Sequence, residues 1–111
     1  MINSIVLTGR LVADPEVKNI EGKDSKVCNI AVAVQKPYKN TEGKYDADFF
    51  NVIVWNDTAE NLSKYCKKGD LIGVEGRLQN RSYDTDNGFK KYVTEIVATK
   101  ITYFGGKKEE E

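Results

Sequence analysis

Residues 47 to 56, ADFFNVIVWN, predict a β-strand with large apolar side chains on both of its faces. Successive side chains of a strand point to opposite faces, so Phe49 and Trp55 share one face while Phe50 and Val52 share the other. A strand that is half-buried in one core is apolar on one face only. The second apolar face of this strand must therefore be covered by something other than the core of the chain.

The segment that follows, DTAENLSKYCKKG at 57–69, has the features of a short helix. Asp57 is the expected N-cap, and Glu60 stands three residues later, as in a capping box. Apolar residues then recur at helical spacing, and Gly69 closes the segment. The sequence therefore predicts one helix directly after the two-faced strand.

The rest of the chain reads as β-strands rich in Val, Ile, Thr and aromatic residues. Turn signals separate them, among them the Asp14-Pro15 pair and the Asn87-Gly88 pair of a hairpin. Glycines inside the strands indicate bulges or sharp bends. Five strands with one helix between the third and the fourth describe an all-β OB-fold, a five-stranded Greek-key barrel that commonly binds oligonucleotides or oligosaccharides. The predicted strands are 2–12, 26–36, 47–55, 70–78 and 91–104.

Length and composition predict one globular domain, since the chain has 111 residues with 40% hydrophobic and 31% charged content. We assign residues 1–104 to the domain and 105–111 to a short, flexible, charged tail. No run approaches the ~18 apolar residues of a membrane helix, and the N-terminus lacks signal-peptide features, so we expect a cytoplasmic protein. Cys28 and Cys66 lack metal-binding spacing and are expected to be reduced, mostly buried thiols.

The overall charge is balanced, with 17 basic and 17 acidic residues, where a nucleic-acid-binding domain is usually basic. Basic residues nevertheless gather beside aromatic ones in three segments. One face of the molecule can therefore be positive while the whole is neutral. The segments are KPYKN at 36–40, RLQNR at 77–81 and FKK at 89–91.

The predicted strand at 26–36 supplies the neighbour of the two-faced strand. One of its faces is a continuous apolar stripe suited to the core: Cys28, Ile30, Val32 and Val34. Its other face is mostly small, which leaves room for a flat ligand: Val27, Asn29, Ala31, Ala33 and Gln35. Phe49 and Trp55 would stand beside that floor with Asn51 between them, as a surface on which rings can stack.

Three longer motifs occur in order along the chain: VLTGRLVADPEV (6–17), ADFFNVIVWNDTAENLSKYCKKG (47–69) and GRLQNRSYDTDNGFKKYVTEIV (76–97). Together they resemble the bacterial and phage single-stranded DNA-binding protein family, particularly its Gram-positive forms. The likeness runs from Met1 to about Phe104. It implies a sequence-independent binder of single-stranded DNA in replication, recombination and repair, built from OB-folds that form a homo-oligomer, most often a tetramer.

The resemblance also implies the residues of the site. Bases would stack on four aromatic positions, which suits sequence-independent binding because every base has a π-face. Basic side chains would hold the phosphates, and Asn51 stands where some relatives carry a basic residue. The aromatic positions are Tyr38, Phe49, Trp55 and Tyr83, and the basic ones are Arg10, Arg81, Lys36, Lys39 and Lys68.

The C-terminus departs from the family pattern. Relatives often continue to an acidic tip ending in Pro-Phe that recruits replication and repair proteins, whereas this sequence ends in GGKKEEE. Recruitment of partner proteins by that route is therefore not expected.

The two faces of residues 47–55 lead to separate expectations. Val52 and Val54 belong in the barrel core, and Phe50 in or near a subunit contact. The opposite face should be a partly exposed apolar patch in the free protein that DNA covers. It carries Phe49, Asn51, Ile53 and Trp55.

Other functions remain open at this stage. The aromatic face could bind RNA or a protein, and Phe49 or Trp55 could pack in a dimer interface. Catalysis is not expected, because the chain has no histidine and no GxxxxGK phosphate loop. We therefore predict no catalytic residues, no cofactor and no metal site. Lysines outside the site are expected to be solvated: Lys44, Lys90, Lys91 and Lys100.

Overall fold

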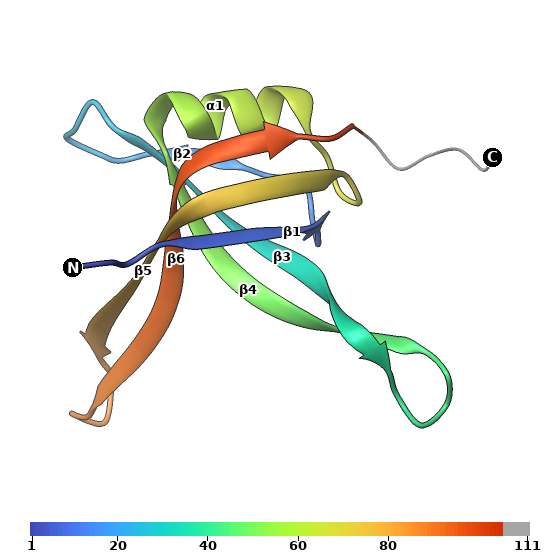
Figure 1. Cartoon of the computed structure of the whole chain (residues 1–111). Coiled ribbons are helices and arrows are strands. Elements are labelled where there is room, and N and C mark those ends of the chain that lie inside the picture. Colours follow the sequence, from blue (N-terminus) through green and yellow to red (C-terminus); the bar gives the residue numbers. More distant parts are fainter. Residues whose placement is uncertain (106–111) are drawn as a thin grey trace.

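The computed structural model describes residues 1–105, which form a β-barrel with a helix lying across one end (Figure 1). Two short strands are followed by four long ones, and the helix follows the two-faced strand directly. The elements are β1 Ile5–Leu11, β2 Val17–Asn19, β3 Lys26–Lys39, β4 Tyr45–Trp55, α1 Asn56–Tyr65, β5 Leu71–Asp84 and β6 Lys90–Tyr103.

The strands form one sheet in the order β1-β5-β6-β4-β3-β2, and an additional pairing of β1 with β3 closes it. The closing pairs are Arg10 with Ala33 and Leu11 with Val32. The contact of β4 with β6 is parallel, while the other ladders are antiparallel. Five strands therefore make the barrel and β2 lies outside it on β3, which confirms the predicted OB-fold.

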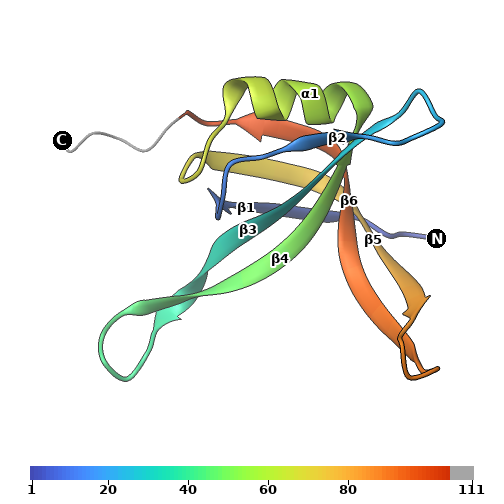
Figure 2. The same cartoon turned by 180° about the vertical axis from the view of Figure 1, so that it is seen from behind.

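Two hairpins extend beyond the barrel as arms, one made by β3 and β4 and the other by β5 and β6 (Figures 1 and 2). Each turns at a glycine with a positive φ, Gly43 at 79° and Gly88 at 82°. The predicted turns at 40–43 and 84–88 are thus confirmed. The arms make β3 and β5 longer than predicted, and β4 begins two residues earlier, at Tyr45.

The core fills the barrel and continues under α1, whose Ala59 and Leu62 are fully buried. Cys28 is buried and Cys66 is partly buried, and both thiols are free. Burial raises the pKa of both thiols, which keeps them protonated and unreactive. The buried core comprises Leu11, Cys28, Ile30, Val32, Val52, Val54, Ala59, Leu62, Ile72, Val74, Ile96, Ala98 and Ile101.

Glycine is required at two places where strands cross closely. A Cβ at Gly9 would overlap the carbonyl oxygen of Ala33, where β1 and β3 close the barrel. A Cβ at Gly76 would overlap the carbonyl oxygen of Val97, and the β5–β6 register shifts at this residue. The irregularity that the sequence predicts at glycines inside strands is therefore confirmed at Gly76, whereas Gly9 marks a close approach of two strands.

The predicted capping box is wrong. Trp55 occupies the N-cap position without a side-chain hydrogen bond, and Asp57 lies inside the first turn. Glu60 pairs instead with Lys26, which lies at the start of β3. The helix also ends at Tyr65, four residues before the predicted Gly69, because the chain turns there to enter β5.

The short strand β2 was not predicted, because its three residues lie in a charged segment with little β-propensity. In the described part of the chain no helix is long and apolar enough to cross a membrane. The predicted tail falls, beyond Gly105, outside the described residues, so the domain boundary stays a prediction.

Candidate nucleic-acid interface

The outer face of β3 and β4 carries a row of large side chains beside a row of small ones. Phe49 is 68% exposed and Trp55 is 40% exposed, although both are aromatic. Asn51 lies between them and is also exposed. We call this face the stacking surface. Its cross-strand pairs are Val27 with Trp55, Asn29 with Ile53, Ala31 with Asn51 and Ala33 with Phe49.

Ile53 departs from the prediction for this face. It is only 7% exposed, because β6 pairs alongside β4 at this point and sets Val97 next to it. The exposed part of the stacking surface is therefore aromatic and polar, with Ile53 packed beneath. On the opposite face Val52 and Val54 are fully buried, as predicted. Phe50 is 37% exposed, so its place in a subunit contact stays a prediction.

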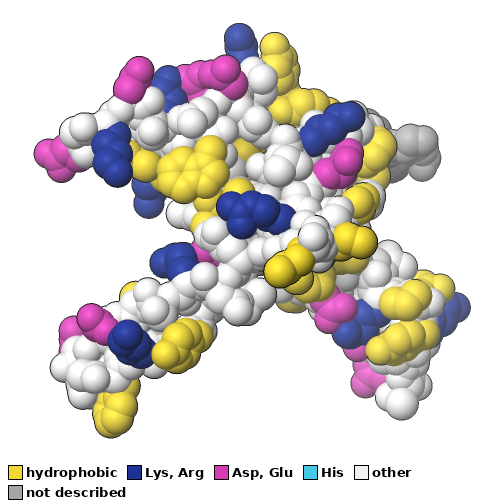
Figure 3. Space-filling model, turned by 60° about the vertical axis from the view of Figure 1, so that its left-hand side comes forward, with side chains coloured by type: hydrophobic (Ala, Val, Ile, Leu, Met, Phe, Trp, Pro, Cys, Tyr) yellow, Lys and Arg dark blue, Asp and Glu magenta, His cyan; other side chains and the backbone are white. Residues whose placement is uncertain are grey.

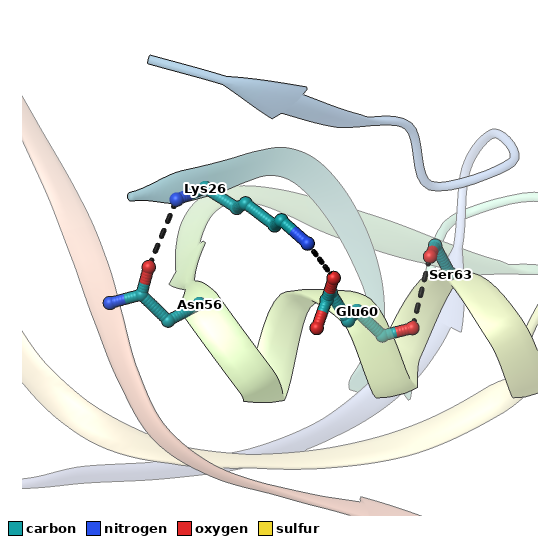
Figure 4. Close-up of polar contacts among 4 residues, drawn as sticks. All are labelled: Lys26, Asn56, Glu60 and Ser63. Carbon is teal, nitrogen blue, oxygen red and sulfur yellow. Dashed lines mark hydrogen bonds and ion pairs between the residues drawn. The ribbon is translucent and has the colours of Figure 1, made fainter. Parts of the chain in front are cut away.

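Trp55 is the last residue of β4, and the contacts of Asn56 and Glu60 at the start of α1 hold the junction that follows it (Figure 4). Asn56 has a φ of 51°, in the left-handed region that asparagine tolerates better than most residues. Its side-chain oxygen accepts a 2.9 Å hydrogen bond from the backbone N–H of Lys26. The Lys26 ammonium pairs with Glu60, and this bond raises the pKa of Lys26. These contacts tie the end of β4 to the start of β3, directly beside Trp55.

A cleft of about 420 Å³ lies beside Asn51, where the two arms diverge. We call it the central cleft. Arg81 and Glu95 face each other in it, with 2.6 Å between the Arg81 Nε and a carboxylate oxygen of Glu95. Residues from β3, β4, β5 and β6 line the cleft, among them Asn29, Ala31, Asn51, Ile53, Arg81, Val93, Thr94 and Glu95.

The ion pair leaves part of the Arg81 guanidinium free. Only its Nε donates to Glu95, and its terminal nitrogens make no hydrogen bond to any of residues 1–105. The Arg81 side chain is 54% exposed, whereas that of Glu95 is 6% exposed. Gln79 donates a second hydrogen bond of 3.0 Å to the same Glu95 oxygen. The buried carboxylate thus orients an arginine that can still bind an anion.

A second cleft, of about 330 Å³, lies at the Phe49 end of the stacking surface, and we call it the side cleft. Arg10 reaches it from β1, and its terminal nitrogen donates a 2.9 Å hydrogen bond to the carbonyl of Gly69. Tyr45 reaches it from β4 and is 50% exposed. Thr8, Gly9, Arg10, Ala33, Gln35, Tyr45, Asp46, Ala47 and Leu71 line this cleft.

The remaining predicted residues lie away from the middle of the stacking surface, and Lys39 lies on β3 with its ammonium 5.8 Å from the centre of the Tyr45 ring. Tyr38 and Tyr83 are 63% and 44% exposed, one on each arm. Lys68 lies in the turn after α1, where its backbone N–H bonds to Asp14. Lys36 forms a 2.6 Å ion pair with Asp48, which alternates with Phe49 along β4. The structure therefore does not bring Lys36 to the stacking surface.

The structure thus brings Phe49, Asn51 and Trp55 together, with Arg81 at one edge and Arg10 at the other. Sequence reasoning missed Glu95 and Tyr45. For Tyr45 a signal existed, because it continues the odd-numbered row of β4 two residues before the predicted strand start. Figure 3 shows hydrophobic and basic side chains exposed on the barrel and on both arms. Within residues 1–105 no cluster of acidic and cysteine side chains is suited to hold a metal ion.

Comparison with known proteins decides the family. The Single-strand binding protein family matches residues 2–104. The chain belongs to this family. The resemblance that the sequence motifs indicated is therefore confirmed, and family membership also supports the prediction of a binding protein without catalytic activity.

Individual relatives agree along nearly the whole chain. Single-stranded DNA-binding protein 1 of Clostridium acetobutylicum is 44% identical over 108 residues, which cover 97% of this chain and 98% of the relative. Single-stranded DNA-binding protein B of Bacillus subtilis is 39% identical over 99% of this chain and 96% of its own length. Single-stranded DNA-binding protein 1 of Lactococcus lactis is 47% identical over 88% of this chain, but only 65% of that longer relative is covered.

A solved structure matches the fold as well. It is described as the Plasmodium falciparum SSB complex with ssDNA, and it superposes with a TM-score of 0.81 at 27% identity. The match covers 95% of this chain and 96% of the other. The barrel with its two arms is therefore an architecture found in a complex with single-stranded DNA.

The buried carboxylate of Glu95 at the central cleft should make the free energy of unfolding depend on pH. Burial by itself raises the pKa of Glu95, but the hydrogen bonds from Gln79 and Arg81 outweigh it, so the pKa lies below its ordinary value of 4.5. The stability from this carboxylate is complete above about pH 4.5 and is lost as the pH falls through the lowered pKa. We therefore expect Glu95→Gln to lower the free energy of unfolding at pH 7. The gap in this free energy between wild type and variant should become smaller as the pH falls.

Urea denaturation at several pH values between 7 and 3 measures this difference. Glu75→Gln, which neutralises an exposed carboxylate on β5, is the control for losing one negative charge. A wild-type advantage over Glu95→Gln that stays constant across this pH range would contradict the assignment.

Proposed function

We propose that this chain binds single-stranded DNA without sequence preference, with bases stacked on the stacking surface and phosphates held at its edges. The observation that carries the proposal is the exposure of Phe49 and Trp55 above a floor of small β3 side chains. Membership of the Single-strand binding protein family supports it, as do the names of the relatives. The similar Plasmodium structure, a complex with ssDNA, supports it further.

The geometry fits a ligand whose sequence is not read. An aromatic ring stacks with any base and contributes about 1 to 3 kcal/mol per base. Arg81 and Arg10 flank the rings and can neutralise phosphates, although the chain carries no net charge. Tyr38 and Tyr83 extend the row of aromatics onto the arms, where a strand of DNA lying across the surface would pass.

We also propose the setting in which this binding occurs. The family supports a role in replication, recombination and repair. We expect the chain to work as a homo-oligomer, most often a tetramer, with Phe50 in or near a subunit contact. Its place of action would be the cytoplasm, where bacterial and phage DNA is found.

Titration with different ligands tests the proposed function directly. Oligo(dT) should quench the fluorescence of Trp55, the single tryptophan of the chain, because a stacked base contacts its ring. Oligo(U) should quench it more weakly, and unrelated peptides should not. Equal or stronger binding of oligo(U) would indicate an RNA-binding protein, and quenching by peptides alone would indicate a protein-interaction module.

Removal of either ring should weaken the binding of DNA. We expect Trp55→Ala and Phe49→Ala each to lower the affinity for oligo(dT) by about 1 to 3 kcal/mol, the contribution of one stacked base. Fluorescence anisotropy of a labelled oligo(dT) measures this without the tryptophan signal. Tyr65→Ala is the control, because Tyr65 is an exposed ring that lines neither cleft. A folded Trp55→Ala or Phe49→Ala variant with unchanged affinity would remove that ring from the binding site.

Arg81 and Arg10 should each account for part of the salt dependence of DNA binding. On a logarithmic plot of affinity against salt concentration, we expect Arg81→Ala or Arg10→Ala to reduce the slope by about 0.7, the value for one single-strand phosphate contact. Lys100→Ala removes an exposed positive charge from β6 and should leave the slope unchanged. Because Arg81→Ala also deprives Glu95 of its partner, circular dichroism must show that the variant is folded. Identical slopes in all four proteins would exclude both arginines.

A further inference from the structure

We propose that Tyr45 and Arg10 form an additional nucleotide subsite in the side cleft, with the ring of Tyr45 stacking a base and Arg10 holding its phosphate. This inference rests on the proposed binding of single-stranded DNA. It extends the path of the strand beyond Phe49 along the β3–β4 arm, toward the turn of that hairpin.

The position of Tyr45 on β4 places it in line with the stacking surface. The β4 strand runs from Tyr45 to Trp55, so alternation along it assigns Tyr45, Ala47 and Phe49 to one face. The irregularity in this part of the ladder lies on β3, which shifts register between Gln35 and Lys39. Ala47 pairs with Gln35 and Phe49 pairs with Ala33, and both partners also line the side cleft. A strand of DNA that leaves Phe49 in this direction therefore crosses the small side chain of Ala47 and reaches the ring of Tyr45.

The ring of Tyr45 is free to accept a base. It is 50% exposed and pairs with no other aromatic ring of residues 1–105, and the Lys39 ammonium lies 5.8 Å from the ring centre. A single exposed ring is common on a protein surface, but Tyr45 extends the exposed row that Phe49 begins on β4, and a continuous exposed apolar surface marks a binding site. The neighbouring Lys39 adds a positive charge beside the ring, which favours a nucleotide over a neutral ligand.

Arg10 supplies the phosphate contact at the opposite wall of the cleft. One terminal nitrogen is fixed by the carbonyl of Gly69, so the guanidinium is held in place while its remaining donors stay available. Asp46 also lines the cleft, and its carboxylate accepts a 3.2 Å hydrogen bond from Asn40. Because Asp46 repels phosphate, the phosphate belongs on the Arg10 side and the base on the Tyr45 side.

Substitutions at Tyr45 separate stacking from simple apolar contact. We expect Tyr45→Leu to weaken oligo(dT) binding roughly 5- to 150-fold, the loss of one stacked base, whereas Tyr45→Phe should bind as wild type. Tyr65→Leu is the matched control at an exposed tyrosine outside both clefts and should also bind as wild type. A folded Tyr45→Leu protein with wild-type affinity would overturn the subsite.

A fluorescence reporter locates the contact independently of affinity. In a Trp55→Phe background, which keeps a ring on the stacking surface, Tyr45→Trp introduces a single indole at the side cleft. We expect oligo(dT) to quench its emission and to shield it from acrylamide. An indole that stays unquenched while DNA binds, or one that acrylamide cannot reach before DNA is added, would overturn the subsite.

These experiments distinguish loss of DNA binding as a whole from loss of the Tyr45 subsite alone. If the wild-type protein does not bind oligo(dT), the proposed function is wrong. If the wild type binds, Trp55→Ala weakens binding and Tyr45→Leu does not, the function stands and only the additional subsite is wrong.

Discussion

Alternation along β4 is the constraint on which the rest of the structure depends, because one strand has to serve the core and the ligand surface together. Val52 and Val54 are fully buried and lock the strand against Ile30 and Cys28 of β3. A slip of one residue would move these valines outward and force Phe49 and Trp55 into the core. The same packing that stabilises the barrel therefore keeps two large rings exposed. Exposed rings in a row on one face of a sheet are expected where a ligand covers them part of the time.

Charge is arranged locally around that surface, although the chain as a whole is neutral. Arg81 and Arg10 each use one nitrogen to anchor themselves in the protein, which leaves other donors of the planar group for an anion. Lys36 directs its ammonium to Asp48 on the opposite face of the sheet. Position relative to the stacking surface, rather than basic composition, thus determines which charges can meet phosphate. The buried Glu95 orients Arg81, but its carboxylate also places one negative charge in the central cleft, close to where DNA would lie.

The sequence predicted the features that follow from alternation and from turn residues. The barrel, the helix after β4, the inward stripe of β3 and the hairpin at Asn87-Gly88 all follow from periodicity and local backbone preference. Features that depend on contacts between distant segments were missed. Glu60 resembled a capping residue, but Lys26 lies close enough in space to bind it. Ile53 lies on the outer row, but the parallel approach of β6 buries it.

The central claim is that the outer face of β4 is open in the free protein and covered by DNA in the complex. Acrylamide quenching of Trp55, the chain's single tryptophan, tests it most directly. With 40% of Trp55 exposed, acrylamide should quench its emission in the free protein, and saturating oligo(dT) should shield it. A tryptophan that is already shielded without DNA would contradict the account and would show that the aromatic face is an interface between protein chains.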